Sequence, residues 1–466
     1  MRTVTDLPEP AGLPLLGHMP ALARGGAMHR TLFEWQQRHG STYRVRLGSQ
    51  PTVVTSAPTI VDAVLRRRPD AFRRGRQMSD VIDELGGHGL FNAEGDDWRR
   101  LRRSAVPGLT AASLRGAFAM MTRSTGRLRD DWAARAGERV AVLDDLMLYT
   151  LEVIVALTLG HDLDAIRHRD QDGLHHRLPL VASTVVRRMY SPVPYWRWLP
   201  LAADRRTAAV IDEVRRLTAQ RLEEAERRMT AGEEPSSYLE TLVRSSMDNG
   251  EALTATDASG AVLNMLVAGE DNTAAQVSWA MHHLARHPEV QAKVRAETAE
   301  MLGQRGIPDD PRTLSRLRYV EAVVKETMRV SPPSPFVVME AVHDTTVPDG
   351  ADELAIDRGT VLILLLSHGA ETDAERFDDP GSFRPERWLS DPPRTSASAA
   401  PYLPFGSGPR FCPGRNLALI ESMLLVAMSC HNFAIEPDLS AGPVGERVTL
   451  SVFPTNLGVR FRPHPV

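Results

Sequence analysis

The stretch that decides the fold is Phe405-Gly406-Ser407-Gly408-Pro409-Arg410-Phe411-Cys412-Pro413-Gly414-Arg415, a glycine-rich loop leading into an apolar run that starts near Asn416. Glycines allow a backbone to approach a flat ligand closely. The start of a helix, with arginines nearby, would stabilise a thiolate on Cys412. A thiolate in such a loop is what axial ligation of a haem iron requires. A buried cysteine in an ordinary turn is the alternative for an isolated Cys-Pro-Gly, but the complete string argues against it.

This loop resembles the signature of the cytochrome P450 family of haem-thiolate mono-oxygenases, Phe-x-x-Gly-x-Arg-x-Cys-x-Gly. The signature is matched at Phe405, Gly408, Arg410, Cys412 and Gly414. The resemblance implies a mainly α fold with small β-sheets, in which haem b lies between the long central helix and the helix after the cysteine loop. It also implies that Cys412 is the axial ligand of the haem iron and that the other four residues bind the cofactor.

Composition excludes several classes of protein. The chain has 466 residues, of which 42% are hydrophobic and 24% charged, so it is neither disordered nor fibrous. Its formal net charge of −4 provides no overall basic field for nucleic acid. The two cysteines favour a reducing cytosol, and we expect a cytoplasmic protein without a secretory signal or a membrane span. Only Lys293 and Lys325 among the 55 basic residues are lysines, which favours a bacterial source.

No linker divides the sequence, so we expect a single domain over residues 1–466 that begins with a proline-rich lead-in over 1–20, in which the stretch from Pro8 to Pro20 is extended. Apolar residues at three- and four-residue spacing predict helices over 208–229, 258–284, 288–302, 313–330 and 416–430. Short β-like runs predict strands over 42–47, 51–55, 361–366 and 448–453. Breaker-rich segments predict loops over 231–237, 332–335 and 391–401.

Glu326 and Arg329 lie three residues apart and therefore on one face of a predicted helix. Exposed pairs of this kind are common and weak, so the pair alone indicates little. In the P450 family, however, a Glu-x-x-Arg helix is followed by a Pro-Glu-Arg segment whose arginine completes a buried network, and Arg387 lies in such a segment. The resemblance implies that Glu326, Arg329 and Arg387 form a structural triad that secures the haem loop.

The long helix carries two adjacent acids, Glu270 and Asp271, inside an apolar run. Buried charge is costly and usually has a purpose. The family motif places an acid and a threonine here to deliver protons to iron-bound dioxygen, and its glycine opens a local distortion over the iron. Ala268, Gly269 and Asp271 match, but Asn272 occupies the usual threonine position and Thr273 follows one residue late. An amide relays protons less well than a hydroxyl, so we expect Asp271 with a water on Asn272, or a substrate hydroxyl, to take over.

Three further positions are weighed as cofactor contacts. Trp98 and Arg102 resemble the Trp-x-x-x-Arg whose side chains reach a haem propionate in the family. Many relatives bind the other propionate with an arginine where this chain has Met339, and His343 is a candidate substitute; a solvated histidine after a strand is the alternative.

His283 and His287 have helical metal-ligand spacing but are interpreted as structural.

The resemblance implies insertion of one oxygen atom of O2 into a hydrophobic small molecule, in bacterial secondary metabolism. Electrons would come from an external ferredoxin or flavodoxin-type donor with its reductase, because the chain has no flavin or nicotinamide fingerprint. By position, 78–91, 181–199 and 335–338 are candidate substrate-facing segments, although aromatic clusters are more often core. Two alternatives stay open: non-hydroxylating haem-thiolate chemistry, such as oxidative coupling or peroxide use, and a non-catalytic recruitment module. The intact Cys412 and triad speak against the module.

Overall fold

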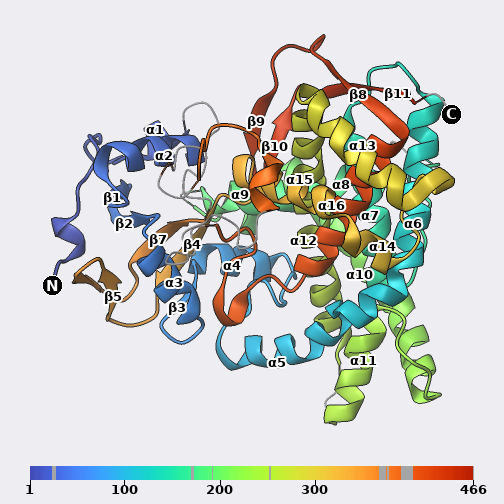
Figure 1. The fold of residues 1–466 in the computed structure, drawn as a ribbon. Helices are drawn as coiled ribbons and strands as arrows, with labels where there is room; N and C mark the ends of the chain where they lie inside the picture. The colour runs from blue at the N-terminus through green and yellow to red at the C-terminus, as the bar shows by residue number, and fades with distance from the viewer. Residues whose placement is uncertain are drawn as a thin grey trace. The chain divides into compact units, whose positions relative to one another are not determined.

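The computed structural model describes residues 1–23, 28–168, 173–191, 193–250, 253–366, 374, 377–389 and 402–464. Helices dominate these residues, and their strands form one five-stranded sheet and three two-stranded sheets (Figure 1), so the expected mainly α fold with small sheets is confirmed. The chain divides into two compact units, which we describe separately. Unit 1 comprises Met1–Ser79, Glu326–Cys412 and Glu446–Phe453, and unit 2 comprises Asp80–Lys325, Pro413–Gly445 and Pro454–Val466.

Unit 1 is organised by the five-stranded sheet, whose strands lie in the order β1-β2-β7-β4-β3. β2 and β7 run parallel, and the other neighbours are antiparallel. The strands that lie in or overlap this unit are β1 (Thr42–Leu47), β2 (Gln50–Thr55), β3 (Phe72–Arg74), β4 (Phe336–Ala341), β5 (Thr345–Asp349), β6 (Asp352–Ile356), β7 (Val361–Leu365), β9 (Gly445–Val448) and β10 (Val452–Thr455). The helices are η1 (Val4–Asp6), α1 (Met19–Ala23), α2 (Met28–His39), α3 (Pro58–Arg66), η6 (Pro385–Trp388) and η7 (Gly408–Arg410).

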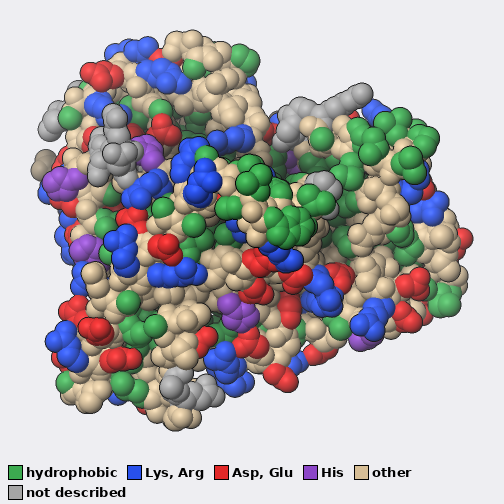
Figure 2. Space-filling model, turned by 180° about the vertical axis from the view of Figure 1, so that it is seen from behind, with side chains coloured by type: hydrophobic (Ala, Val, Ile, Leu, Met, Phe, Trp, Pro, Cys, Tyr) green, Lys and Arg blue, Asp and Glu red, His purple; other side chains and the backbone are tan. Residues whose placement is uncertain are grey.

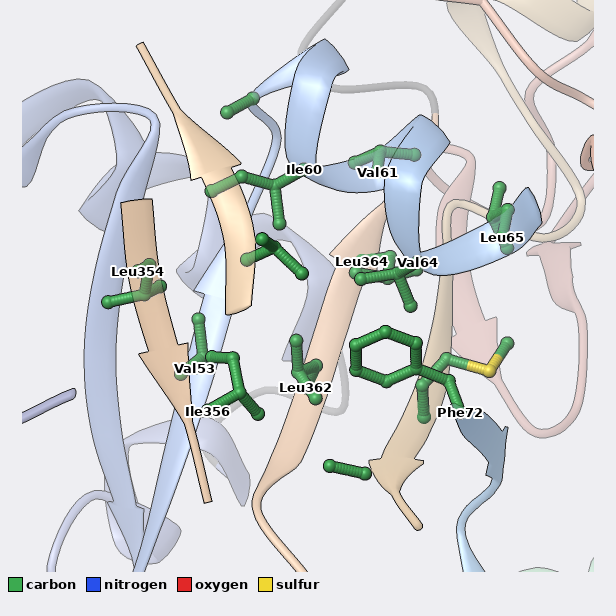
Figure 3. Close-up of a cluster of buried hydrophobic side chains, with 14 of the residues drawn as sticks. Val53, Ile60, Val61, Val64, Leu65, Phe72, Leu354, Ile356, Leu362 and Leu364 are labelled. Atoms are coloured by element: carbon green, nitrogen blue, oxygen red, sulfur yellow. The ribbon is translucent and has the colours of Figure 1, made fainter. Parts of the chain in front are cut away.

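One apolar face of α3 covers this sheet. Ile60, Val61, Val64 and Leu65 recur at helical spacing and are all buried. Figure 3 shows these side chains pointing toward residues of the sheet and of β6, and the labelled partners are Val53, Phe72, Leu354, Ile356, Leu362 and Leu364. This packing fixes the end of α3, which supports the cysteine loop described below.

Unit 2 is mainly helical. Its longest helix, α12 (Ala255–Arg286), packs against α7, α10 and α16 (Figure 1). The other helices are α5 (Gly95–Ala105), η3 (Val106–Leu109), α6 (Ala111–Ala134), α7 (Val142–Leu159), α8 (Leu174–Arg177), α9 (Pro179–Met189), η4 (Tyr195–Arg197), α10 (Ala202–Thr230), α11 (Tyr238–Asn249), α13 (Pro288–Leu302), η5 (Gly303–Arg305), α14 (Pro311–Arg316) and α16 (Arg415–Asn432). β8 (Phe433–Asp438) pairs with β11 (Gly458–Pro463). α4 (Arg76–Glu84) and α15 (Arg318–Val330) contribute residues to both units. None of the described helices combines the length and the hydropathy needed to span a bilayer.

Most predicted elements are confirmed. The helices predicted over 208–229, 258–284, 288–302 and 416–430 are α10, α12, α13 and α16, and the first three predicted strands are β1, β2 and β7. The predicted loops over 231–237 and 332–335 are confirmed as well. The loop predicted over 391–401 lies outside the described residues.

Two predicted elements are wrong in extent. The helix predicted over 313–330 is two helices, α14 and α15, which are separated at Leu317. Glu297 accepts hydrogen bonds from the backbone N–H groups of Tyr319 (2.8 Å) and Val320 (3.0 Å), and this capping starts a new helix. The strand predicted over 448–453 is a hairpin, in which a turn after β9 reverses the chain into β10.

Candidate active site

The cysteine loop is a tight turn in unit 1 that depends on glycine. Gly406 and Gly408 have φ values of 70° and 71°, in the left-handed region that favours glycine. The Cys412 N–H donates to the Phe405 carbonyl (2.9 Å), and this hydrogen bond closes the loop. A Cβ on Gly408 would lie 2.6 Å from the Leu65 carbonyl oxygen, so the loop rests directly on the end of α3. Four of the signature residues predicted from the sequence therefore belong to one compact structure: Phe405, Gly408, Arg410 and Cys412. Gly414, the fifth, is the N-cap of α16.

The two cysteines differ in what they offer a ligand. Cys412 is partly exposed at the end of the glycine turn. Cys430 is 1% exposed inside α16, and burial raises the pKa of its thiol. Because the thiolate is the metal-binding form, Cys412 fits an axial iron ligand and Cys430 does not. A partly exposed cysteine on a backbone that packs closely through glycine offers the donor that haem ligation needs, so the loop fits this cofactor.

The predicted triad is present in unit 1, and Glu326 is its centre. Its carboxylate is fully buried and accepts hydrogen bonds from Arg329 Nε (2.9 Å), Arg329 Nη2 (2.7 Å) and Arg387 Nε (3.0 Å). The Arg329 guanidinium also donates to the carbonyl oxygens of Pro380 (2.8 Å) and Ser382 (3.0 Å). Charge-assisted bonds of this kind offset the cost of burying charge only when the geometry is complete. The triad thus ties α15 to the segment around η6.

Two further donors to Glu326 were missed by the sequence analysis. Trp388 Nε1 donates to Oε2 (2.8 Å), and the Arg384 backbone N–H donates to Oε1 (2.9 Å). Trp388 directly follows the Pro-Glu-Arg segment, and an indole N–H normally finds a partner when it is buried, which is the signal that could have identified it. A backbone donor such as that of Arg384 leaves no signal in the residue type.

α12 presents neighbouring residues to different surroundings. Ala268 is exposed and Asn272 is partly exposed, and the Asn272 amide donates to the Ala268 carbonyl one turn earlier (3.4 Å). Asp271 and Thr273 are instead turned into unit 2, each 4% exposed. The helix continues unbroken through Gly269, so the expected local distortion is not seen. A Cβ on Gly269 would lie 2.6 Å from Ile154 Cδ1, so the glycine serves the close packing of α12 on α7.

Buried acids gather on the inward side of α12. Glu270 is 1% exposed, and burial, followed by the charge of Asp271, raises its pKa well above the ordinary range. Its Oε1 has no hydrogen-bond partner among the described residues. Glu421 of α16 is also buried, and burial raises its pKa to about 8 against the smaller opposing effect of a hydrogen bond from Thr273. The Glu421 carboxyl group is therefore predominantly protonated at neutral pH, and Glu270 holds its proton more tightly than an exposed carboxyl group does.

Glu421 was missed by the sequence analysis, although a signal was present. It is an acid within the apolar run of the helix that follows the cysteine loop. The same observation singled out Glu270 and Asp271 in the long helix. Its partner Thr273 was weighed only as a displaced threonine, and the structure pairs it with this acid.

The remaining candidates are distributed as follows. α5 places the buried Trp98 and the half-buried Arg102 one turn apart on the same side of the helix. His343 is exposed in the turn after β4, and its Nδ1 lies 2.9 Å from the Asp344 carbonyl oxygen, which favours the interpretation as a solvated histidine. His287 ends α12 as its C-cap and pairs with Glu289 (2.9 Å). Among the described residues, no cluster of three His, Cys, Asp or Glu side chains could hold a metal ion.

Part of the first predicted substrate-facing segment is held on α12 by one side chain. The Asn264 amide donates to the Gly87 carbonyl and accepts a hydrogen bond from the Phe91 N–H (2.9 Å). Gly260 gives room for the His88 carbonyl oxygen against the same helix. The 87–91 segment is therefore in a defined position above α12.

Comparison with known proteins agrees with this site. A family model described as Cytochrome P450 matches residues 7–455. The dolabradiene monooxygenase of Zea mays is 27% identical over 439 residues, which cover 91% of this chain and 85% of the relative. The cyclooctat-9-en-7-ol 5-monooxygenase of Streptomyces melanosporofaciens is 28% identical, and the match covers 92% of this chain and 89% of the relative. The mitochondrial 25-hydroxyvitamin D-1 alpha hydroxylase of Homo sapiens is 29% identical, and the match covers 97% of this chain and 91% of the relative. With the cysteine loop and the Glu326 network in place, the chain belongs to the cytochrome P450 family and is a haem-thiolate mono-oxygenase.

Proposed function

We propose that this mono-oxygenase holds haem b through Cys412 and inserts one oxygen atom of O2 into a hydrophobic small molecule. The observation that carries the proposal is the partly exposed Cys412 on a turn that Gly406 and Gly408 make possible. When bound, the cofactor supplies the activation of dioxygen. Phe405, Arg410 and Gly414, together with Trp98 and Arg102, are proposed to hold it, and a ferredoxin or flavodoxin-type donor with its reductase is proposed to supply electrons.

The proposed substrate class draws support from the relatives. By their names, three of them act on dolabradiene, cyclooctat-9-en-7-ol and 25-hydroxyvitamin D. We propose a similarly apolar small molecule for this chain. The open face of α12 at Ala268 offers it an apolar surface, and Asn272 is a polar group there that can orient it or hold a water.

Proton handling is proposed to depend on both faces of α12. Asn272 would position a water on the open side, where its amide already bonds the Ala268 carbonyl. On the inward side, Glu421 has a pKa of about 8 and accepts a hydrogen bond from Thr273, so it can take up or release a proton near neutral pH. Asp271 directly precedes Asn272 in the sequence and is buried. If Asn272 cannot relay protons, non-hydroxylating chemistry is the second candidate.

We further propose a single functional domain in a cytoplasmic, bacterial protein. The family match extends across residues of both units, which supports one domain. Neither cysteine forms a disulfide, which suits a reducing compartment. The Streptomyces relative supports a bacterial source.

The test of the proposal is ligation of the iron. The purified protein is reduced and exposed to carbon monoxide, and its visible spectrum is compared for the wild type, Cys412→Ser and Cys430→Ala. We expect the thiolate signature in the wild type and in Cys430→Ala, and its loss in Cys412→Ser. Retention of the signature in Cys412→Ser would overturn the assignment. Hydrophobic compounds are then titrated into the ferric protein, and a shift of the Soret band identifies those that bind.

A further inference from the structure

His88 has an acidic side chain at each of its two ring nitrogens. Exposed histidines are seen at several places on one face of the molecule (Figure 2), so exposure alone singles out none of them. The ring of His88 is distinguished by its partners: Nδ1 lies 2.7 Å from Asp83 Oδ1, and Nε2 lies 2.7 Å from Asp97 Oδ2. Asp83 belongs to α4 and Asp97 to α5, and these two contacts are called the His88 latch from here on.

The His88 latch requires a charged imidazole. A carboxylate only accepts hydrogen bonds, so both ring nitrogens must carry a proton to donate to Asp83 and Asp97. A neutral imidazole has one N–H and would turn a lone pair toward one of the carboxylates. Burial opposes the charged form, but the hydrogen bonds and charges of the two acids outweigh burial and raise the pKa of His88 above its ordinary 6.5. The latch is therefore complete below pH 6.5 and is lost as the pH rises through this raised pKa.

Other donors hold the two carboxylates in place. The Asn92 amide donates to Asp83 Oδ1 (2.6 Å), and its oxygen accepts from the Gly89 N–H (3.2 Å). Arg100 Nη2 donates to Asp97 Oδ1 (2.7 Å), while Oδ2 of the same carboxylate faces the imidazole. Each acid thus has one bond that does not depend on pH near neutrality and one that depends on the imidazole.

The surroundings of the His88 latch add one further charge. The guanidinium of Arg215, on α10, lies beside Gly86 and donates to Asp212 (3.0 Å). α12 contributes the neutral amide of Asn264 to the same segment. The charges nearest the imidazole are therefore the two acids of the latch and Arg100, which pairs with one of them.

The His88 latch holds the backbone between α4 and α5 against α12. A Cβ on Gly260 would collide with the His88 carbonyl oxygen, so this backbone touches the helix directly. One turn further along α12, the Asn264 amide bonds the Gly87 carbonyl and the Phe91 N–H. The 87–91 segment is thus fixed to α12 on one side and to the two acids on the other.

This contact adjoins the surface of α12 that we assign to the substrate. Gly260, Asn264, Ala268 and Asn272 follow one another at four-residue intervals and hence lie along one side of the helix. The 87–91 segment occupies the turns at Gly260 and Asn264, and the exposed Ala268 is one turn beyond. Movement of the segment would therefore alter the edge of the substrate surface.

We propose that His88 is a positioning residue: its charged imidazole keeps the 87–91 segment on α12, so that the affinity for an apolar substrate falls as His88 loses its proton. The inference rests on the proposed function, because it takes the open face of α12 at Ala268 as the substrate surface. His88 acts through the segment and needs no contact with the substrate. When the latch opens, the segment gains freedom, and binding must then include the cost of ordering it again.

The first measurement is amide hydrogen exchange of the full holoprotein, read by mass spectrometry on peptides that cover residues 87–93. Rates from about pH 6 to about pH 9 are divided by those of the unstructured peptide, which removes the intrinsic pH dependence of exchange. The wild type is expected to lose protection in this segment by about three- to fivefold as the pH rises, the usual size of an exposed ionic contact.

Two substitutions should remove this pH dependence in opposite directions. His88→Gln cannot donate to both acids at any pH, so its protection should be low throughout. Asp97→Asn should keep the protection high up to about pH 9, because its NH2 can donate to neutral Nε2 while its oxygen still accepts from Arg100. A purely structural contact would not be rescued by this isosteric change. His168→Gln alters an exposed histidine beside Asp164 (3.9 Å) and is the control, expected to behave as the wild type.

The second measurement is the affinity for an uncharged apolar probe. Limonene, farnesol and progesterone carry no charge in this pH range, and the one that shifts the Soret band most at about pH 6 is titrated at each pH. We expect its Kd to rise by about threefold or more in the wild type between the two ends of the range. The Kd should be constant and weak in His88→Gln, and constant and tight in Asp97→Asn. Circular dichroism confirms that each variant is folded.

Three results would overturn the proposal. The first is protection of the 87–93 peptides that does not change with pH in the wild type. The second is a His88→Gln profile equal to that of the wild type. The third is an exchange profile of the expected form with a probe Kd that does not follow it, or with no Soret shift by any probe, because the latch would then be structural only. Failure of the proposed function is read separately, from the carbon monoxide spectrum, which does not depend on the latch.

Discussion

Replacement of Glu326 by glutamine tests whether the buried network secures the cysteine-loop unit. Oε1 accepts from Arg329 Nη2, Arg384 N and Arg387 Nε, and Oε2 accepts from Arg329 Nε and Trp388 Nε1. Whichever oxygen becomes the amide NH2, at least two N–H donors then face another donor. The fully buried Arg329 also loses its counter-charge. We expect a loss of about 3–5 kcal/mol in the free energy of unfolding, the usual cost of breaking a buried ion pair.

The chain supplies a matched control for this prediction. Glu224 pairs with Arg221 at the same three-residue helical spacing (3.0 Å), but the side chains are 49% and 33% exposed. Glu224→Gln should therefore change stability by less than about 0.5 kcal/mol. Denaturant-induced unfolding is followed by circular dichroism and by haem absorbance, and midpoints are compared because a chain of two units need not unfold in one step. Equal midpoints for Glu326→Gln and Glu224→Gln would refute the reasoning, since burial would then have no effect.

Three further predictions concern the loop and the two faces of α12. Gly408→Ala should lower the free energy of unfolding by about 1–3 kcal/mol more than Gly406→Ala does, as measured by thermal unfolding. Both glycines have φ values near +70°, but only a Cβ on Gly408 would meet the Leu65 carbonyl oxygen. Equal losses of stability in the two variants would contradict this contact. The pKa of Glu421 in the folded protein is about 8, above its ordinary value of 4.5. The folded protein therefore holds this proton more tightly than the unfolded chain does, and its stability falls as the pH rises from 4.5 to 8. Glu421→Gln should remove that loss, at most roughly 4–5 kcal/mol, and a melting-temperature difference from wild type that does not grow with pH would contradict it. Asn272→Thr should change the product formed per electron consumed, and an unchanged ratio would argue against a role for Asn272 in proton handling.

Much of the site could be predicted from the sequence because its chemistry is local. The cysteine loop requires glycines at fixed positions for its turn, and Gly408 is required twice, by its φ and by its contact with Leu65. The helix that carries Glu326 and Arg329 shows its pairing in a three-residue spacing. Arg387 lies 61 residues after Glu326, so it was assigned to the triad through the resemblance to the P450 family and not through local spacing.

Features that depend on distant contacts could not be predicted in the same way. The break between α14 and α15 depends on Glu297, which lies 22 residues before Tyr319 in the sequence. Its carboxylate caps α15 by accepting hydrogen bonds from the backbone N–H groups of Tyr319 and Val320. The protonated state of Glu421 depends on burial beneath α12 and on Thr273. The spacing of apolar residues predicts which face of a helix is buried, but it does not predict which acidic side chain will be buried when another helix packs against it.

The departure at Asn272 and Thr273 takes a different meaning once burial is known. Consecutive helical residues point about 100° apart, so an amide and a hydroxyl at 272 and 273 cannot serve the same face. The partly exposed Asn272 lies with Ala268 on the open face, and the buried Thr273 bonds Glu421 on the other. The chain therefore keeps an acid and an alcohol in contact, but on the inward side of α12, with the acid supplied by α16. A threonine introduced at 272 would add a hydroxyl to the open face without removing the inward pair, so its effect on coupling reports the open face alone.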